Sequence, residues 1–205
     1  MESQLSSPLF ADLCNRVRVL ESHFLPLAPS PLGDYTEEQQ LDAKACVLLV
    51  HAEVETYLEG ISRLLCTTAL DQIKAGRYSE LSSAFIFEAG HDQRVVTSCP
   101  NSLEEASRAF HNIKCNQIKA NNGIKESDLK HLFGTFSLIT EDFPPELTVA
   151  LNSFGALRGR CAHTSAIGAQ KTNDCFEIRT QIDELMELLK SFDSIYSKWT
   201  VQTQQ

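Results

Sequence analysis

The chain has 205 residues, a formal net charge of −9 and seven cysteines. Its length suffices for one well-formed core, and its hydrophobic share of 42% and charged share of 22% are those of an ordinary soluble globular protein. No apolar run is long enough to span a bilayer, the N-terminus lacks a basic secretory region, and the cysteine spacing indicates reduced thiols. We therefore expect a single cytoplasmic domain over residues 1–205, without a broad nonspecific nucleic-acid surface.

The first third of the chain predicts two helices. Residues 8–25 carry apolar side chains at helical spacing, and prolines then end that helix. Thr36-Glu37-Glu38-Gln39 is a capping-box pattern that opens the longest predicted helix. Apolar residues in steps of four and three form its core seam: Ala43, Val47, Val50, Val54, Tyr57, Ile61 and Leu64. His51 and Glu55 flank this seam one turn apart and could interact. The simpler interpretation is that they form an ordinary side-chain pair beside the core, without a functional role.

Residues 76–101 break this helical rhythm. Ala84-Phe-Ile-Phe87 and Val95-Val-Thr97 are β-prone, so we expect a short β excursion around residues 84–99, and the sequence leaves its form open. His91 between them is a predicted loop residue rather than a ligand, because no second metal-binding residue type lies at a useful spacing. No CxxC or Cys/His cluster indicates zinc, and we expect no metal and no cofactor.

Two further helices are predicted in the middle of the chain. Ser102-Leu-Glu-Glu105 opens one that continues to about Lys119, and Ser127 caps another. A local basic concentration covers this region, comprising Arg108, Lys114, Lys119, Lys125 and Lys130. Solvated helix faces are the commoner explanation for such lysines. The alternative is a track for the phosphate backbone of RNA, in which Lys114 and Lys119 bind substrate.

Pro144-Pro145 starts a helix that runs into the stretch from Phe154 to Ser165, as one helix or two abutting ones. A final helix follows, with its apolar stripe at Ile178, Ile182, Leu185, Leu189, Phe192, Tyr196 and Trp199. The fold class is therefore all-α, an antiparallel helical bundle.

The stretch from Phe154 to Ser165 places two arginines and a histidine within six positions, Arg158, Arg160 and His163. Arginine is a fixed cation, whereas the unperturbed pKa of histidine lies near neutrality. Phosphodiester cleavage needs a cation for the phosphate and a group that transfers a proton. Clustered charge alone is only a probabilistic indication of function, since most such groups lie on solvated helix faces.

The spacing of the motif suggests a second copy of the chain. Positions five apart lie about 140° apart around a helix, so Arg158 and His163 would converge only across a cleft or between two copies. Small residues recur at intervals of four, three and four, namely Gly155, Gly159, Ala162 and Ala166. Because small side chains permit close approach of another backbone, we expect Gly155, Gly159 and Ala162 at a dimer interface.

Arg158-Gly-Arg-Cys-Ala-His163 resembles the Arg-x4-His signature of the HEPN superfamily. Its members are helical, usually dimeric, and many are metal-independent ribonucleases of toxin–antitoxin, antiviral and RNA-processing systems. The position after the arginine, often Asn, Asp or His in the family, is Gly159 here. The resemblance implies a HEPN-type bundle with an RNA substrate, no membrane association, and as partners a second copy and an antitoxin or other defence-system protein.

The resemblance also implies residue roles. Arg158 and His163 would be catalytic in an endoribonuclease that uses the 2′-hydroxyl of RNA as nucleophile. Arg160 and Thr164 would bind substrate, and Glu55 on the early helix would hold Arg158 through a bidentate hydrogen bond. The competing interpretation is a non-catalytic HEPN-like helical interaction or regulatory module. The acidic net charge and Gly159 favour that module, whereas the presence of both motif residues disfavours it.

Overall fold

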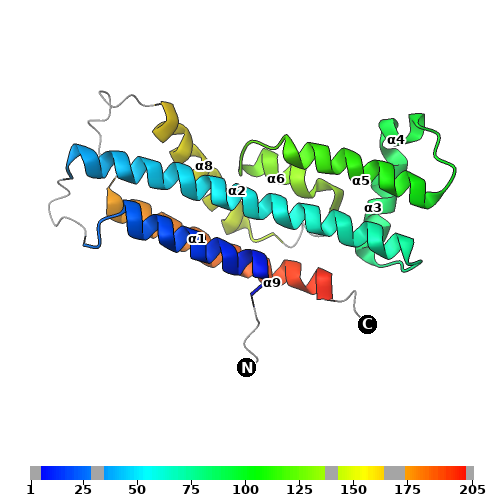
Figure 1. Ribbon diagram of the computed structural model, residues 1–205, viewed down its shortest axis with the longest axis horizontal. Helices are drawn as coiled ribbons and strands as arrows, with labels where there is room; N and C mark the ends of the chain where they lie inside the picture. The colour runs from blue at the N-terminus through cyan, green and yellow to red at the C-terminus, as the bar shows by residue number, and fades with distance from the viewer. Residues whose placement is uncertain (1–5, 29–34, 137–142, 164–173, 202–205) are drawn as a thin grey trace.

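The computed structural model describes residues 6–28, 35–136, 143–163 and 174–201. Within these ranges all regular secondary structure is helical and no strand is formed, which confirms the predicted all-α bundle (Figure 1). The elements are α1 (Pro8–Phe24), α2 (Glu37–Lys74), α3 (Glu80–His91), α4 (Gln93–Thr97), α5 (Leu103–Lys119), α6 (Glu126–Phe133), the 3-10 turn η1 (Gly134–Phe136), α8 (Pro145–His163) and α9 (Cys175–Val201).

Helix α2 is the central element of the fold. Its 38 residues span about 57 Å at the usual helical rise, and it contacts α1, α3, α5, α6, α8 and α9 (Figure 1). The predicted capping box is confirmed, because the Thr36 hydroxyl accepts from the Gln39 amide at 3.2 Å and Gln39 accepts from the Thr36 amide at 2.9 Å. The predicted seam is buried except at its end, where Leu64 is 41% exposed and Leu65 is buried instead.

The β excursion predicted around residues 84–99 is not formed, since α3 and α4 occupy this stretch. Helix α3 buries Leu81, Phe85 and Ala89, which are spaced one helical turn apart, and leaves Phe87 exposed. The Phe85 ring packs against Phe110 of α5 with 4.9 Å between ring centroids. These tertiary contacts at helical spacing outweigh the local β propensity. Accordingly His91 is the last residue of α3 rather than a loop residue.

Helix α6 begins at Glu126, two residues before the position at which the predicted Ser127 cap would start it. The Asp128 carboxylate accepts from the Lys125 amide at 2.8 Å, and the Asn152 side chain of α8 accepts from the Glu126 amide at 2.9 Å. Since the first amides of a helix have no partner within the helix, these two acceptors determine where α6 begins and attach it to α8.

Helix α8 continues without a break from Pro145 to His163. Of the two predicted arrangements, one helix or two abutting helices, the single helix is the one formed. It buries Leu151, Phe154 and Leu157, and α9 buries Ile178, Ile182, Leu185 and Leu189 in the same hydrophobic core. Among the described residues, none of the helices combines the length and the apolar character that crossing a membrane requires.

A buried carboxylate connects α1, α2 and α9. Asp193 of α9 is 1% exposed. It accepts from the Ser7 amide at 2.8 Å and from the Tyr57 hydroxyl at 3.1 Å, and the Ser7 hydroxyl also donates to it. Ser7 in turn caps α1, because its hydroxyl accepts from the Phe10 amide at 3.1 Å. This network fixes the start of α1 against the two longest helices.

Candidate active site on helix α8

The motif residues occupy the C-terminal half of α8. Arg158 is partly buried, whereas Arg160 and His163 are exposed, and His163 is the last residue of the helix. Thr164, predicted to bind substrate, lies outside the described residues. On this continuous helix Arg158 and His163 are separated by about 140° of rotation and about 7.5 Å of rise. Within one chain, their side chains therefore leave the helix in different directions.

Arg158 faces a pair of titratable side chains on α2. Burial, and after it the positive charge of Arg158, lower the pKa of His51 to about 4. Burial also raises the pKa of Glu55, the neighbouring Glu59 carboxylate adds to that rise, and Arg158 opposes it. The same arginine thus acts on both groups, which places its charge beside this face of α2. At neutral pH the His51 imidazole is therefore neutral beside the Arg158 cation.

The bidentate bond predicted between Glu55 and Arg158 is not formed: among the described residues no carboxylate oxygen lies within ion-pair distance of this guanidinium. The carboxylate has other partners instead. It accepts from the Asn121 side chain at 3.4 Å and from the Gly123 backbone amide, and one of its oxygens lies 3.8 Å from His51 Nδ1. Glu55 therefore interacts with Arg158 through the electric field rather than through a direct bond.

The stripe of small residues on α8 divides into two parts. Gly155 is buried, and a Cβ added there would lie 3.0 Å from Cγ and 3.1 Å from Cε of Lys125 in the same chain. Because the Lys125 side chain covers Gly155, a second copy could contact this glycine only after that side chain moved, and its place in a dimer interface stays a prediction. Gly159 has no atom within 4 Å of an added Cβ, and Ala162 is exposed. These two positions are accessible to a second copy.

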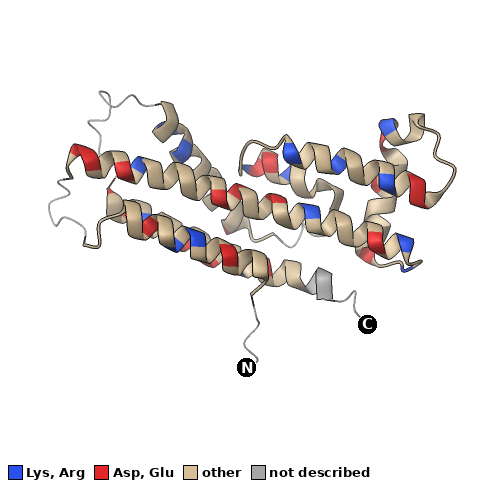
Figure 2. Ribbon diagram, in the orientation of Figure 1, with Lys and Arg blue, Asp and Glu red and all other residues tan. Residues whose placement is uncertain are grey.

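The basic residues of the middle region differ in their surroundings (Figure 2). Arg108 pairs with Glu104 at 2.6 Å and Lys130 with Glu126 at 2.7 Å, each within its own helix. Lys119, predicted to bind substrate, is exposed at the end of α5. The remaining member, Lys125, lies against α8. The sequence assigns Lys125 to the basic region but does not indicate its contact with α8. That contact depends on the glycine at position 155.

Lys114 is not an RNA-binding residue. It is 5% exposed, burial lowers its pKa, and its ammonium donates to the His131 carbonyl at 3.1 Å. The Ser62 hydroxyl of α2 donates to the next carbonyl, that of Leu132, at 2.7 Å. Both acceptors belong to the last turn of α6, whose carbonyls have no partner within the helix. Lys114 therefore stabilises the end of α6, and a phosphate backbone cannot reach it.

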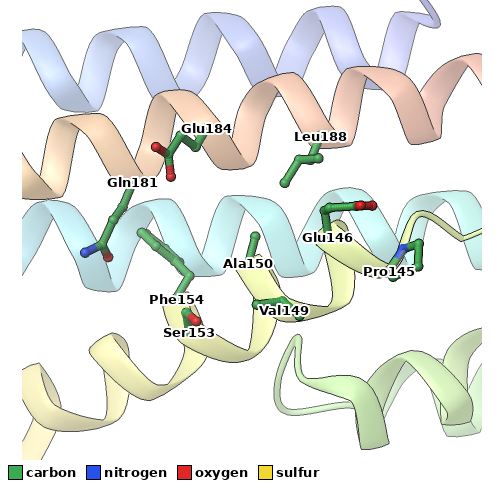
Figure 3. A pocket seen from close by; sticks show the side chains of 9 residues that line it. All are labelled: Pro145, Glu146, Val149, Ala150, Ser153, Phe154, Gln181, Glu184 and Leu188. Carbon is green, nitrogen blue, oxygen red and sulfur yellow. The ribbon is translucent and has the colours of Figure 1, made fainter.

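A groove of about 620 Å³ lies between α8 and α9 (Figure 3). Val149, Ala150 and Leu188 give it an apolar lining, and the acidic side chains Glu146 and Glu184 lie apart along it (Figure 3). None of the described residues that line this groove is a lysine or an arginine. Its two carboxylates would repel a phosphate, so it does not suit the substrate that the motif suggests.

Within the described ranges, no group of three or more His, Cys, Asp or Glu side chains could hold a metal ion. All seven cysteines are free thiols, four of them buried. Asn121 and Asn152 are further site residues that the sequence did not identify, because their partners Glu55 and Glu126 lie far away in the chain.

Comparisons of this chain with protein-family models, with curated proteins and with solved structures found no match. The HEPN resemblance therefore depends on the Arg158–His163 motif together with the helical fold.

Proposed function

We propose that this protein is a cytoplasmic, HEPN-like endoribonuclease that cleaves RNA without a metal ion and acts as a homodimer. The observation that carries the proposal is the surroundings of Arg158. The guanidinium is partly buried beside the α2 cluster of His51 and Glu55, on the same helix whose exposed end carries His163. A cation near carboxylates and a buried neutral imidazole is the type of perturbed electrostatic environment that occurs at functional sites.

The chemistry assigned to the two motif residues is transfer of the phosphoryl group to the neighbouring 2′-oxygen. His163 of one copy accepts the 2′-hydroxyl proton, and His163 of the other copy donates a proton to the leaving 5′-oxygen. The 2′-oxygen bonds to phosphorus, the bond from phosphorus to the 5′-oxygen breaks, and a 2′,3′-cyclic phosphate remains. Arg158 stabilises the negative charge that builds on the phosphorane oxygens. Arg160 binds a neighbouring phosphate.

In this proposal the active site contains residues of two copies of the chain, because His163 of one copy lies beside Arg158 of the other. Since Arg158 and His163 of one chain diverge, the site forms where two α8 helices meet, with Arg158 from each copy facing the shared phosphate. Gly159 and Ala162 are suited to that contact because, among the described residues, no atom lies within 4 Å of a Cβ added at Gly159, and Ala162 is exposed. An antitoxin or another defence-system protein would then regulate the dimer.

The deciding experiment incubates the purified full-length chain with RNA in the presence of a chelator. Wild type is compared with His163→Ala, and product ends are tested for a cyclic phosphate. We expect cleavage by wild type, loss in the variant, and resistance of a substrate with 2′-deoxy groups. Normal cleavage of the 2′-deoxy substrate would contradict attack by the 2′-hydroxyl.

The alternative is a non-catalytic HEPN-like interaction module. The divergence of Arg158 and His163 within one chain, together with Gly159 after the motif arginine, favours it. A strictly monomeric protein in sedimentation experiments that cleaves no RNA would support this module against the enzyme. The two proposals therefore differ in oligomeric state as well as in activity.

A further inference from the structure

Lys125 lies along the motif helix in a position that only a glycine permits. An ideal Cβ at Gly155 would lie 3.0 Å from Lys125 Cγ, 3.7 Å from Cδ and 3.1 Å from Cε. Contacts with three methylene groups mean that the lysine stem runs across the surface of α8 at this glycine. A side chain at 155 would therefore require the stem to shift. Gly155 thus has a packing role within its own chain.

This position brings the lysine close to the motif arginine. Gly155 and Arg158 are three residues apart and so are neighbours on one face of α8. The charges of Lys125 and Arg158 both lower the pKa of His51, after the larger effect of burial. Two cations from different helices therefore surround the same buried imidazole.

The backbone that carries Lys125 is attached at several points. Its own amide donates to Asp128 at 2.8 Å, and the next amide, that of Glu126, donates to Asn152 of α8 at 2.9 Å. Upstream, the Asn121 side chain donates to the Gly123 carbonyl at 2.9 Å and contacts Glu55 of α2. The loop between α5 and α6 is thereby fixed to α2 and α8. The Lys125 and Glu126 amides therefore already have acceptors, and the charged group that this loop offers to an anion is the lysine side chain.

Lys125 also differs from the other cations of its region. Arg108 and Lys130 have carboxylate partners in their own helices, and Lys114 is buried. The Lys125 ammonium has no carboxylate within ion-pair distance among the described residues, and its side chain is exposed. It is thus an available positive charge, placed beside Arg158 by packing rather than by an ion pair.

We propose that Lys125 binds the RNA phosphate next to the one that Arg158 binds, and that Gly155 exists to hold the lysine there. This inference rests on the proposed RNA substrate and assigns one more phosphate contact to it. It also predicts where the substrate leaves the motif helix, because the backbone of the RNA must pass over the junction of α6 and α8.

The test measures RNA binding in a His163→Ala background, with a fluorescein-labelled single-stranded RNA of mixed sequence as the probe. Lys125→Gln is compared with Lys130→Gln, which removes the same charge from the same helix at an exposed position. Loss of one phosphate contact should lower the slope of log affinity against log salt by about 0.7 for Lys125→Gln. Lys130→Gln should leave the slope unchanged, and circular dichroism should show both variants folded.

Gly155→Ala provides a second arm that changes no charge. It should weaken RNA binding in the presence of Lys125 and have no further effect once Lys125→Gln is present. Equal effects of Lys125→Gln and Lys130→Gln, or no effect of either, would overturn the lysine contact while leaving the proposed function intact. If the protein with intact Lys125 binds no RNA, the proposed function fails and this contact with it.

Discussion

Two polar clusters share helix α2 but are built in opposite ways. Tyr57 and Glu55 are two residues apart, so they point to nearly opposite sides of the helix. On the Tyr57 side, Asp193 is 1% exposed and accepts hydrogen bonds from Tyr57 and from two groups of Ser7. Burial raises the pKa of Tyr57, and the Asp193 carboxylate raises it further, so the hydroxyl remains a donor.

The Glu55 side of α2 is less completely paired. His51 is 5% exposed and has a lowered pKa, Glu55 has a raised pKa, and Arg158 affects both without forming an ion pair. Burial opposes the charged form of each titratable group here. The nearest contact between His51 and Glu55, at 3.8 Å, is too long for a hydrogen bond.

This difference in pairing suggests that the Asp193 cluster stabilises the fold and that the Arg158 cluster belongs to a functional site. A buried carboxylate with several donors holds elements together, and its removal exposes their unsatisfied groups. A cluster with displaced pKa values and a partly exposed cation is typical of functional sites. We therefore expect substitutions on the Asp193 side to change stability, and those on the Arg158 side to change activity.

The largest effects should come from the motif itself. Arg158→Ala should lower RNA turnover by roughly a hundred- to a thousand-fold, because the developing charge loses a fixed donor. His163→Ala should lower it by roughly a hundred- to ten-thousand-fold through loss of the proton carrier. Since both act on one transition state, the double variant should lose less than the product of the two factors. Single-turnover rates in chelator measure all three.

Thermal unfolding of the same variants tests the comparison of the clusters. We expect Arg158→Ala to unfold close to the wild-type midpoint, because the arginine has no direct carboxylate partner in the described part of the chain. A marked loss of stability would instead place Arg158 among the groups that hold α8 to α2. The assignment of the Asp193 cluster to stability and the Arg158 cluster to activity would then be incorrect.

Asp193→Ala should have the largest effect on stability. It leaves the Tyr57 hydroxyl and the Ser7 groups without their acceptor, so we expect a loss of roughly 3–5 kcal/mol in the free energy of unfolding. Urea denaturation measures this loss, and activity per folded molecule should not change. Ser191→Ala is the matched control on the same helix, because Ser191 is exposed and bonds only to the Glu187 carbonyl one turn earlier. Equal stability of the two variants would contradict the structural role of Asp193.

His51 predicts an acid-sensitive fold. Its pKa is about 4 in the folded chain, below its ordinary value of 6.5, so the unfolded chain binds more protons between these values. Its contribution to stability is present above pH 6.5 and is lost as the pH falls through 6.5 toward 4, by about 3 kcal/mol in all. The facing charges are Glu55 of α2, Arg158 of α8, and Lys125 and Asp128 of the α6 start.

Urea denaturation at several pH values between 4 and 7 measures this dependence, beside His51→Gln. The amide of glutamine does not titrate in that range, so the variant should lose less stability on acidification than wild type. If both lose the same amount, another group is responsible for the acid sensitivity.

Helix positions and the motif could be predicted from the sequence because both are local patterns. The Thr36 capping box and the apolar steps along α2 determine that helix without reference to the rest of the chain. Residues 84–97 were wrongly expected to be β, since Phe85 is stabilised by Phe110, a contact that no local pattern contains. Pattern reasoning also could not separate buried Lys114 from exposed Lys119, because burial depends on how α5 packs against α2 and α6.

The site was predictable only in part for the same reason. Arg158, His163 and the acid at Glu55 follow from spacing and resemblance, and their roles stay predictions. The contact between Lys125 and Gly155 joins residues thirty positions apart in the chain, and so does not appear as a motif. The partners of Glu55 likewise lie in the loop after α5, far from it in the chain. Since no local pattern shows these contacts, the sequence predicted a bidentate bond to Arg158 instead.

Glu55→Gln should give the smallest effect and the sharpest test of the division between clusters. Burial and Glu59 raise the pKa of Glu55, so its charged form costs stability at neutral pH, and that contribution becomes more unfavourable as the pH rises. Glutamine keeps an acceptor for Asn121 and for the Gly123 amide while removing the charge. The unfolding midpoint at neutral pH should therefore stay constant or rise slightly. RNA turnover should fall on the order of tenfold, equivalent to about 1.4 kcal/mol, because Arg158 loses its nearest opposing charge.

Glu59→Gln is the matched control for this change. Glu59 lies one turn further along α2 and also contacts Asn121, at 3.3 Å, so its substitution removes a carboxylate from the same loop contact. We expect it to leave turnover unchanged. A drop in stability for Glu55→Gln with normal turnover would mean that Glu55 supports the α5–α6 loop alone. The carboxylate would then belong with Asp193 as a group that stabilises the fold, and Arg158 would have no partner in catalysis on α2.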